Sequence, residues 1–320
     1  MKLTKLAVYA WAVLLVNLGV ILWGAYVRAT GSGAGCGSHW PLCNGEVLPR
    51  APQIETIIEF AHRLSSGVAF LLVVILLVWV LRSTPKRHPT RLGASLAMFF
   101  MVTEALVGAA LVLFEWVAHD ASLGRVISIS IHLVNTFLLL ACLALTAWWA
   151  SGGDPIKLSQ QGMITMVLAI GIAGMLILGV SGAITALGDT LFPSGSLTEG
   201  LSQDFAPTAH FLIRLRVWHP LIAISTGFYI IFISILISFL RSYSLPRKLA
   251  IGLCILIVLQ WAAGLVNVIL LAPVPMQLIH LLLADLVWIL LVLFSATVLA
   301  EREVVSQAEA VRLDQGSQTI

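Results

Sequence analysis

Long apolar runs separated by short polar segments make up most of the chain. Eight runs reach about 20 residues, the length that a helix needs to cross the hydrocarbon core of a bilayer. We predict an all-α integral membrane protein. We expect its eight transmembrane helices near 5–27, 57–81, 92–116, 126–149, 161–187, 212–240, 247–271 and 277–299.

The composition excludes a soluble domain. Hydrophobic residues make up 59% of the 320 positions and charged residues 10%, with a mean hydropathy of +1.01, which leaves too little polar surface for a water-soluble fold. The net charge of +3 does not indicate a nucleic-acid partner. The first apolar run is too long for a signal-peptide core and lacks a small-residue cleavage site.

Lysine and arginine are distributed unevenly between the two sides of the predicted membrane protein. With the N-terminus inside, 12 of the 18 lie on the inner side, and positive residues favour the cytoplasmic side. We therefore expect a multi-pass protein of the cell membrane with both termini in the cytoplasm. The polar residues 303–320 are predicted to form a cytoplasmic tail.

The chain repeats itself weakly. His62 and His219 are 157 residues apart, and His132 and His280 are 148 apart. Four spans per repeat give both halves the same orientation, so we predict two four-helix bundles, 1–152 and 153–302, related by a pseudo-twofold axis along the membrane normal. Small residues, which suit close helix packing, also correspond between the halves, at 22–30 with 180–186 and at 104–108 with 260–264.

These four histidines are predicted to lie at one membrane depth. There is one on each even-numbered span, and counting at 1.5 Å per residue to the inner helix ends places all four near the outer face. Two facing helices of a bundle can clamp a flat macrocycle whose iron takes two axial imidazoles. We predict two bis-histidine heme sites, one formed by His62 and His132 and one by His219 and His280.

Other interpretations of the histidines stay open. They could satisfy local polar needs at a wet interface, or hold a metal alone, although no cysteine or aspartate stands at metal-site spacing. A bis-histidine membrane cytochrome b that transfers electrons from quinol would use the same pairs. A transporter is a further alternative, although the paired midplane helix breaks of that class are not seen.

The first outer loop contains two cysteines. Cys36 and Cys43 lie on the oxidising side of the membrane, where a disulfide is the expected state. The bond would close a short loop over the first histidine pair. Whether it is structural or redox-active is left open.

Glu59 is the candidate for chemistry at the first site. It precedes His62 by three residues and so shares its helix face. A carboxylate there could relay protons or stabilise positive charge on a reacting carbon. Arg216 stands at the matching position of the second half, so we expect the first site to react and the second to transfer electrons. The alternative is an interfacial charge near a helix start.

Several other charged residues are candidates. Arg63, Arg214 and Arg216 are expected at the outer mouth, where they could bind heme propionates or serve only topology. Glu104 and Asp285 lie within apolar spans, where acids are candidates for function. Glu104 could supply protons or pack as a neutral group, and Asp285 has no specific predicted role.

The chain resembles the heme A synthase family. The resemblance is carried by the strings Thr-Gly-Ser-Gly-Ala-Gly-Cys-Gly at 30–37, Trp-Pro-Leu-Cys at 40–43 and Glu-Phe-Ala-His-Arg at 59–63. It covers residues 1 to about 300 and is strongest over 24–67. Some relatives carry a second cysteine pair in the second half, which this chain lacks.

The resemblance implies a reaction and a site. It implies oxidation of the C8 methyl group of heme O to the formyl group of heme A, for terminal oxidases, in a bacterial cell membrane. Heme O would bind between His62 and His132, and a heme b cofactor between His219 and His280. Glu59 would be needed for turnover, and Cys36–Cys43 would be a disulfide. The implied partners are heme O synthase, an unidentified electron donor or acceptor and lipid; a homo-oligomer is compatible with the resemblance.

Overall fold

The computed structural model describes residues 4–50, 52–158, 161–240 and 244–300, and the described part is almost entirely helical. The helices are α1 (Lys5–Ala29), α2 (Ile54–Ser83), α3 (Pro89–Leu113), α4 (Leu123–Ala150), α5 (Gly162–Leu191), α6 (Leu197–Asp204), α7 (Phe211–Arg216), α8 (Trp218–Leu240), α9 (Ser244–Ile269) and α10 (Val274–Ala300), with a short 3-10 turn η1 at Ser32–Ala34. The predicted tail at 303–320 lies outside the described residues.

The eight predicted spans are confirmed. Within the described residues, eight helical segments are long and apolar enough to cross a membrane, with α7 and α8 together forming the sixth. Their ends agree with the predicted ranges to within about four residues. Local capping explains several starts: Thr4 accepts from the N–H of Ala7 at α1, and Ser122 accepts from that of Arg125 at α4.

The sixth span is interrupted where the sequence predicted one continuous helix. α7 ends at Arg216 and α8 begins at Trp218. Pro220 lacks an N–H to bond the carbonyl of Arg216, and its ring crowds that carbonyl. The break therefore falls just before His219.

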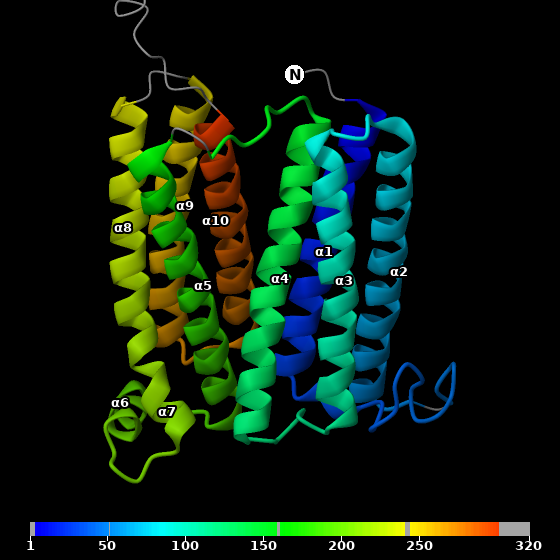
Figure 1. Ribbon diagram of the computed structural model, residues 1–320. Coiled ribbons are helices and arrows are strands. Elements are labelled where there is room, and N and C mark those ends of the chain that lie inside the picture. The colour runs from blue at the N-terminus through cyan, green and yellow to red at the C-terminus, as the bar shows by residue number, and fades with distance from the viewer. Residues whose placement is uncertain (1–3, 51, 159–160, 241–243, 301–320) are drawn as a thin grey trace, which may run out of the picture.

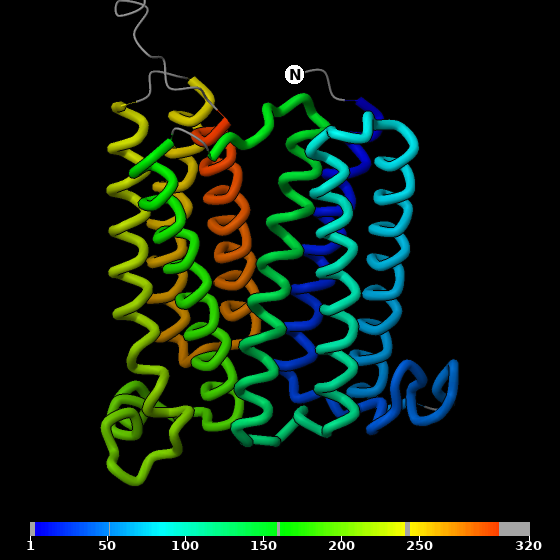
Figure 2. Tube along the Cα trace, in the orientation of Figure 1, coloured from blue at the N-terminus to red at the C-terminus, as the bar shows by residue number. Residues whose placement is uncertain are grey.

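The helices form two groups of four that stand side by side (Figures 1 and 2). In the first group, α1 packs on α2 and α4, and α3 packs on the same two helices. In the second, α5 and α9 each pack on α8 and α10. Each histidine-bearing pair, α2 with α4 and α8 with α10, is therefore diagonal within its group. The pseudo-twofold relation between the groups stays a prediction.

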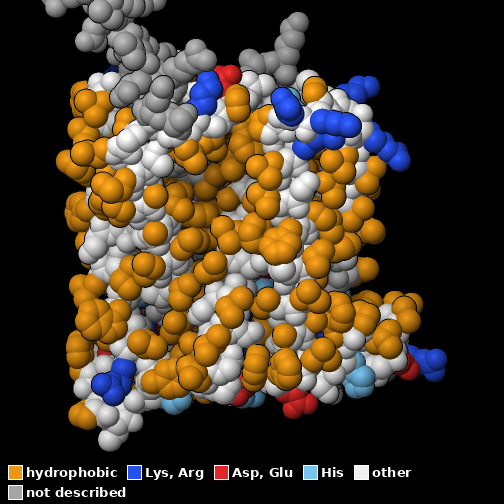
Figure 3. Space-filling model, viewed as in Figure 1, with side chains coloured by type: hydrophobic (Ala, Val, Ile, Leu, Met, Phe, Trp, Pro, Cys, Tyr) orange, Lys and Arg blue, Asp and Glu red, His pale blue; other side chains and the backbone are white. Residues whose placement is uncertain are grey.

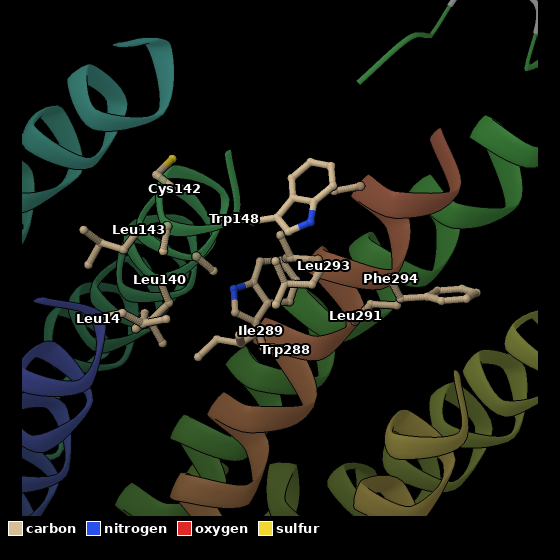
Figure 4. Close-up of a cluster of buried hydrophobic side chains, with 14 of the residues drawn as sticks. Leu14, Leu140, Cys142, Leu143, Trp148, Trp288, Ile289, Leu291, Leu293 and Phe294 are labelled. Atoms are coloured by element: carbon tan, nitrogen blue, oxygen red, sulfur yellow. The ribbon is translucent and has the colours of Figure 1, made fainter. Parts of the chain in front are cut away.

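The two groups meet along α4, α5 and α10. α10 packs on α4 and α1 of the first group, and α5 also packs on α4. The buried face of α10 includes Trp288, which stacks on Phe137 of α4 with ring centres 5.0 Å apart. The indole N–H of Trp288 donates to the carbonyl of Phe137 at 2.6 Å. Figure 4 shows part of this core, with Leu14 of α1 near Leu140 of α4, and Trp288 and Ile289 on α10.

The surface divides by side-chain type. Apolar side chains cover the length of the helices in Figure 3, and most of the visible lysine and arginine lies at the end that bears the N-terminus. The connections that carry α6, α7 and the loop after α1 lie at the opposite end (Figure 1). This arrangement fits a multi-pass membrane protein.

Candidate functional site

All four predicted histidines lie near the end of the molecule that carries the disulfide loop. His62 is eight residues from the start of α2, His132 nine from that of α4, and His280 six from that of α10. His219 is eight residues from the start of α7. At 1.5 Å per residue the four lie about 9–14 Å below the helix ends. Their common depth agrees with the sequence pattern.

His219 and His280 face each other from α8 and α10. Their ring centres are 6.4 Å apart and the ring planes are inclined by 82°. Imidazole nitrogen–metal bonds are about 2.0–2.1 Å, and a ring centre lies roughly 1.1 Å behind its nitrogen, so two rings on opposite sides of one metal ion have centres about 6.3 Å apart. The observed spacing fits a pair of axial ligands.

Three of the four imidazoles lie against a glycine of a neighbouring helix. A methyl group added at Gly24 of α1 would lie 2.9 Å from Cε1 of His62. The same group at Gly182 would lie 3.1 Å from Cε1 of His219, and at Gly264 3.1 Å from Cε1 of His280. Each of these three glycines leaves a gap in its helix surface, here called a glycine notch, and the imidazole ring occupies that gap. The sequence indicated only that small residues recur here for helix packing.

The ring nitrogens of the first pair differ in accessibility. Nδ1 of His62 and Nδ1 of His132 are buried and have no hydrogen-bond partner among the described residues, whereas neither Nε2 is buried in this way. His62 and His132 are close enough to interact electrostatically. The side chain of His132 is 31% exposed although its Nδ1 is covered. Because both Nδ1 atoms are covered, Nε2 is the nitrogen of each ring that could bind an iron.

A carboxylate supports His132 in place of a glycine. Oε1 of Glu104 on α3 lies 3.4 Å from Nδ1 of His132 and accepts from the hydroxyl of Thr136 at 2.5 Å. Oε2 of Glu104 accepts from the amide of Asn135 at 2.5 Å. Gly108 of α3, which corresponds to Gly264 in the second half, does not contact His132, because a methyl group added there has no atom within 4 Å.

The second pair has neutral polar neighbours. The hydroxyl of Ser181 on α5 lies 2.9 Å from Nδ1 of His219. The side-chain amide of Gln260 on α9 lies 3.3 Å from Nε2 of His280. Ring nitrogens near such groups are oriented by hydrogen bonding. Gln260 occupies the position in the second half that Glu104 occupies in the first.

The predicted disulfide is confirmed, and its loop is fastened to α2. Cys36 and Cys43 are bonded, and the N–H of Cys36 donates to Oε2 of Glu59 at 2.8 Å. A methyl group at Gly35 would collide with the backbone of Glu55. Only glycine permits so close an approach. The loop thus packs on the first turns of α2, the helix that carries His62.

Glu59 and Arg63 form an anchor for this loop. Glu59 is only 3% exposed, and its Oε1 accepts from Nε and Nη2 of Arg63 at 3.1 and 2.5 Å. Nη1 of Arg63 donates to the carbonyls of His39 at 2.6 Å and Leu42 at 2.7 Å. Glu59 is therefore a buried, paired carboxylate three residues before His62 on α2, not a solvated charge at a helix start. Its predicted chemical role stays a prediction.

The other predicted arginines differ from each other. Arg216 forms ion pairs with Asp189 at 3.3 Å and with Asp204, so its charge is matched within the outer segment. Arg214 is exposed. Arg28, which the sequence identified only as an outer cation, joins the two helix groups. It donates to the carbonyl of Ala186 at 2.7 Å and to Oε1 of Gln277 at 3.0 Å.

Asp285 lies in α10 with 0% exposure. Neither of its carboxyl oxygens has a hydrogen-bond partner among the described residues. No group of three or more histidine, cysteine, aspartate or glutamate side chains that could hold a metal ion occurs in the described part of the chain. The histidines meet in twos, as ligands of a macrocycle-bound iron would.

Comparison with known proteins supports the sequence resemblance. Residues 7–292 match the family described as Cytochrome oxidase assembly protein. The chain is similar to the heme A synthase of Halalkalibacterium halodurans, with 35% identity over 259 residues, which is 77% of this chain and 81% of that protein. It is also similar to a heme A synthase of Exiguobacterium, with 37% identity over 139 residues, which is 43% of this chain and 46% of that protein.

A longer relative carries a different name. The chain is 57% identical over 317 residues to a protein of Thermus thermophilus named protoheme IX farnesyltransferase. The match covers 99% of this chain but 51% of the relative. This chain thus spans about half the length of that protein.

Proposed function

The chain belongs to the cytochrome oxidase assembly protein family that includes the heme A synthases, and from this premise we propose that it oxidises the C8 methyl group of heme O to the formyl group of heme A. The observation that carries the proposal is the two histidine pairs at one depth, one of them with ring centres 6.4 Å apart. Two irons held side by side suit a reaction that must remove electrons from an unreactive methyl group.

The two pairs receive different occupants in this proposal. His62 and His132 of the bundle 1–152 hold the substrate heme O, and His219 and His280 of the bundle 153–302 hold a heme b cofactor. The irons supply the redox chemistry when the hemes are bound. The ring-centre spacing of 6.4 Å between His219 and His280 supports a seated group in the second half.

Residues of the first half prepare the substrate site. Glu59 is a buried carboxylate three residues before His62, and its oxygens are oriented by Cys36 and Arg63. It holds or transfers a proton, or stabilises positive charge, beside the substrate. The disulfide loop above it limits access of water. The propionates of a heme are assigned to Arg63, Arg214 and Arg216, of which the exposed Arg214 is the most available.

We also propose a setting for the reaction. The farnesyl group named in the Thermus thermophilus relative is the modification that distinguishes heme O from protoheme, so we infer that a heme O synthase is the partner that supplies the substrate. The apolar helices give a farnesylated heme access from lipid. We place the protein in the bacterial cell membrane with both termini in the cytoplasm. An electron donor or acceptor is also required.

Product analysis tests the proposal. The chain is expressed with a heme O source, and extracted hemes are separated by chromatography. We expect heme A or a hydroxylated intermediate. Bound heme without either product would favour a cytochrome b that only transfers electrons.

The Glu59→Gln variant tests the acid. We expect it to retain the second-site heme but to lose most heme A formation, because glutamine cannot carry the proton or the charge. Glu55→Gln, an exposed position one turn earlier on α2, is the matched control and should keep full yield. Full yield from Glu59→Gln would refute the assigned role.

A further inference from the structure

The two histidines of the first pair do not have equivalent supports. Nδ1 of His62 has no partner among the described residues, and its ring rests on Gly24. Nδ1 of His132 also makes no hydrogen bond among the described residues, but it faces a carboxylate, with Oε1 of Glu104 3.4 Å away. Closing this contact by roughly a few tenths of an ångström would form a hydrogen bond of ordinary length.

The carboxylate of Glu104 is fixed before any heme binds. Oε1 accepts from Thr136 and Oε2 from Asn135, both at 2.5 Å. Asn135 is itself held, because its Oδ1 accepts from Thr103 at 2.6 Å and its amide donates to the carbonyl of Phe100 at 2.8 Å. The amide of Asn135 donates to Oε2, and the hydroxyl of Thr136 lies 2.5 Å from Oε1 and 2.9 Å from the carbonyl of His132, so both oxygens of the Glu104 carboxylate are held. Its free direction points to His132.

This carboxylate is confined to the first half. At the corresponding place in the second half stands Gln260, a neutral amide, 3.3 Å from Nε2 of His280. The second pair is therefore assembled without a charge. A carboxylate is not required for two imidazoles to meet, so its presence at the first pair calls for a function specific to that site.

A carboxylate that accepts the Nδ1–H of a ligating histidine orients the ring and makes its other nitrogen a stronger donor. Such support strengthens the bond from Nε2 of His132 to iron. His62 has no such support, and it lies on α2, the helix that also carries Glu59 and binds the disulfide loop. An iron with two histidine ligands has no open position unless one of them leaves.

We propose that Glu104 is a positioning residue that keeps His132 as the permanent axial ligand of the first heme, and that His62 is the ligand that leaves. The step breaks one coordinate bond, from Nε2 of His62 to iron, and moves no electron or proton. It opens a coordination position on the side of α2, the helix that carries Glu59. This inference rests on the proposed binding of heme O between His62 and His132.

Removal of each ligand in turn tests the assignment. The full chain carrying its second-site heme is loaded with heme O as His62→Gly and as His132→Gly. We expect His62→Gly to retain the first heme as a five-coordinate, high-spin species that binds carbon monoxide when reduced, and added imidazole to restore the low-spin spectrum. We expect His132→Gly to bind heme O at least about tenfold more weakly, because loss of even a residue that only supports a ligand costs about 10–100-fold. The opposite pattern, or equal behaviour of the two variants, would overturn the proposal.

An exchange of the supporting residues tests Glu104. In Glu104→Gln we expect ferric heme O to bind about tenfold more weakly while ferrous binding changes little, which raises the midpoint potential of the first site by about 59 mV. In Gln260→Glu, the matched variant of the second half, we expect the potential of the second site to fall. A residue that only stabilised the fold would change the melting temperature without a selective change in potential. An unchanged first-site potential in folded Glu104→Gln would contradict the assignment.

The second-site heme separates the failure of this inference from that of the proposed function. Its absorption reports that each variant is folded. If the wild-type chain keeps that heme but binds no heme O, both the proposed function and the inference fail. If the wild-type chain produces heme A and Glu104→Gln leaves the first-site potential unchanged, the inference alone fails.

Discussion

The glycine notches make a quantitative prediction about heme affinity. Gly264→Ala places a methyl group 3.1 Å from Cε1 of His280, whereas carbon atoms in contact are normally about 3.5–4.0 Å apart. The ring must shift by a few tenths of an ångström or more, and overpacking of this kind costs about 1–3 kcal/mol. Because each 1.4 kcal/mol is tenfold, heme b should bind about 5- to 140-fold more weakly.

The helix itself should not be weakened by this change. Alanine is favoured over glycine within a helix by about 0.5–1 kcal/mol, so a loss of heme from Gly264→Ala cannot be attributed to an unstable α9. Gly108, the corresponding glycine of the first half, provides the control, because a methyl group there meets no atom within 4 Å. Gly108→Ala should retain both hemes and unfold at the same or a higher temperature.

The assay is transfer of heme from the purified protein to an excess of a heme-binding acceptor, followed by the Soret absorption. We expect the second-site heme to be lost faster from Gly264→Ala and from Gly182→Ala than from the wild type. Gly108→Ala should lose heme at the wild-type rate. Wild-type rates in both notch variants would refute the claim that these glycines seat ligating rings.

Three further perturbations have defined outcomes. His219→Ala should remove the resident heme, and unchanged heme b content per chain would contradict its role as a ligand. Trp288→Phe should lower the free energy of unfolding by about 1–3 kcal/mol, because a buried hydrogen bond is lost. Thermal unfolding measures this, and the exposed Trp218→Phe is the control that should not change stability. Equal effects of the two variants would refute the importance of the contact with Phe137. Asp285→Asn should not lower the unfolding temperature, because burying a carboxyl group without a partner is costly and the amide has a similar shape. A clear loss of stability would show that the acid has a partner.

Much of the architecture could be predicted because membrane helices are local features. The length of an apolar run determines whether it can span a bilayer, and the eight spans were located to within a few residues. The disulfide was predictable from two cysteines in one outer loop. The small helix α6 could also have been found, because Ser196 accepts from the N–H of Glu199 in the Ser-x-x-Glu pattern of a capping box.

The details of the site depend on contacts between distant segments, which no local pattern specifies. Glu59 shares a helix face with His62 in the sequence, but its bond to Cys36 depends on how the loop folds back. The sequence identifies Arg28 only as an outer cation, and its hydrogen bonds to Ala186 and Gln277 of the other half are visible only in the structure. The diagonal placement of the histidine-bearing helices likewise follows from packing, whereas the sequence suggested only facing neighbours.

The central claim is that two histidines from diagonally placed helices coordinate one heme iron. Electron paramagnetic resonance of the oxidised, heme-loaded protein tests this claim most directly. His219 and His280 have ring planes inclined by 82°, so the second-site heme should give a low-spin ferric signal with the large anisotropy of nearly perpendicular axial imidazoles, and His280→Ala should abolish it. A purified, folded protein that shows only high-spin heme, or no heme after heme-replete expression, would contradict the account.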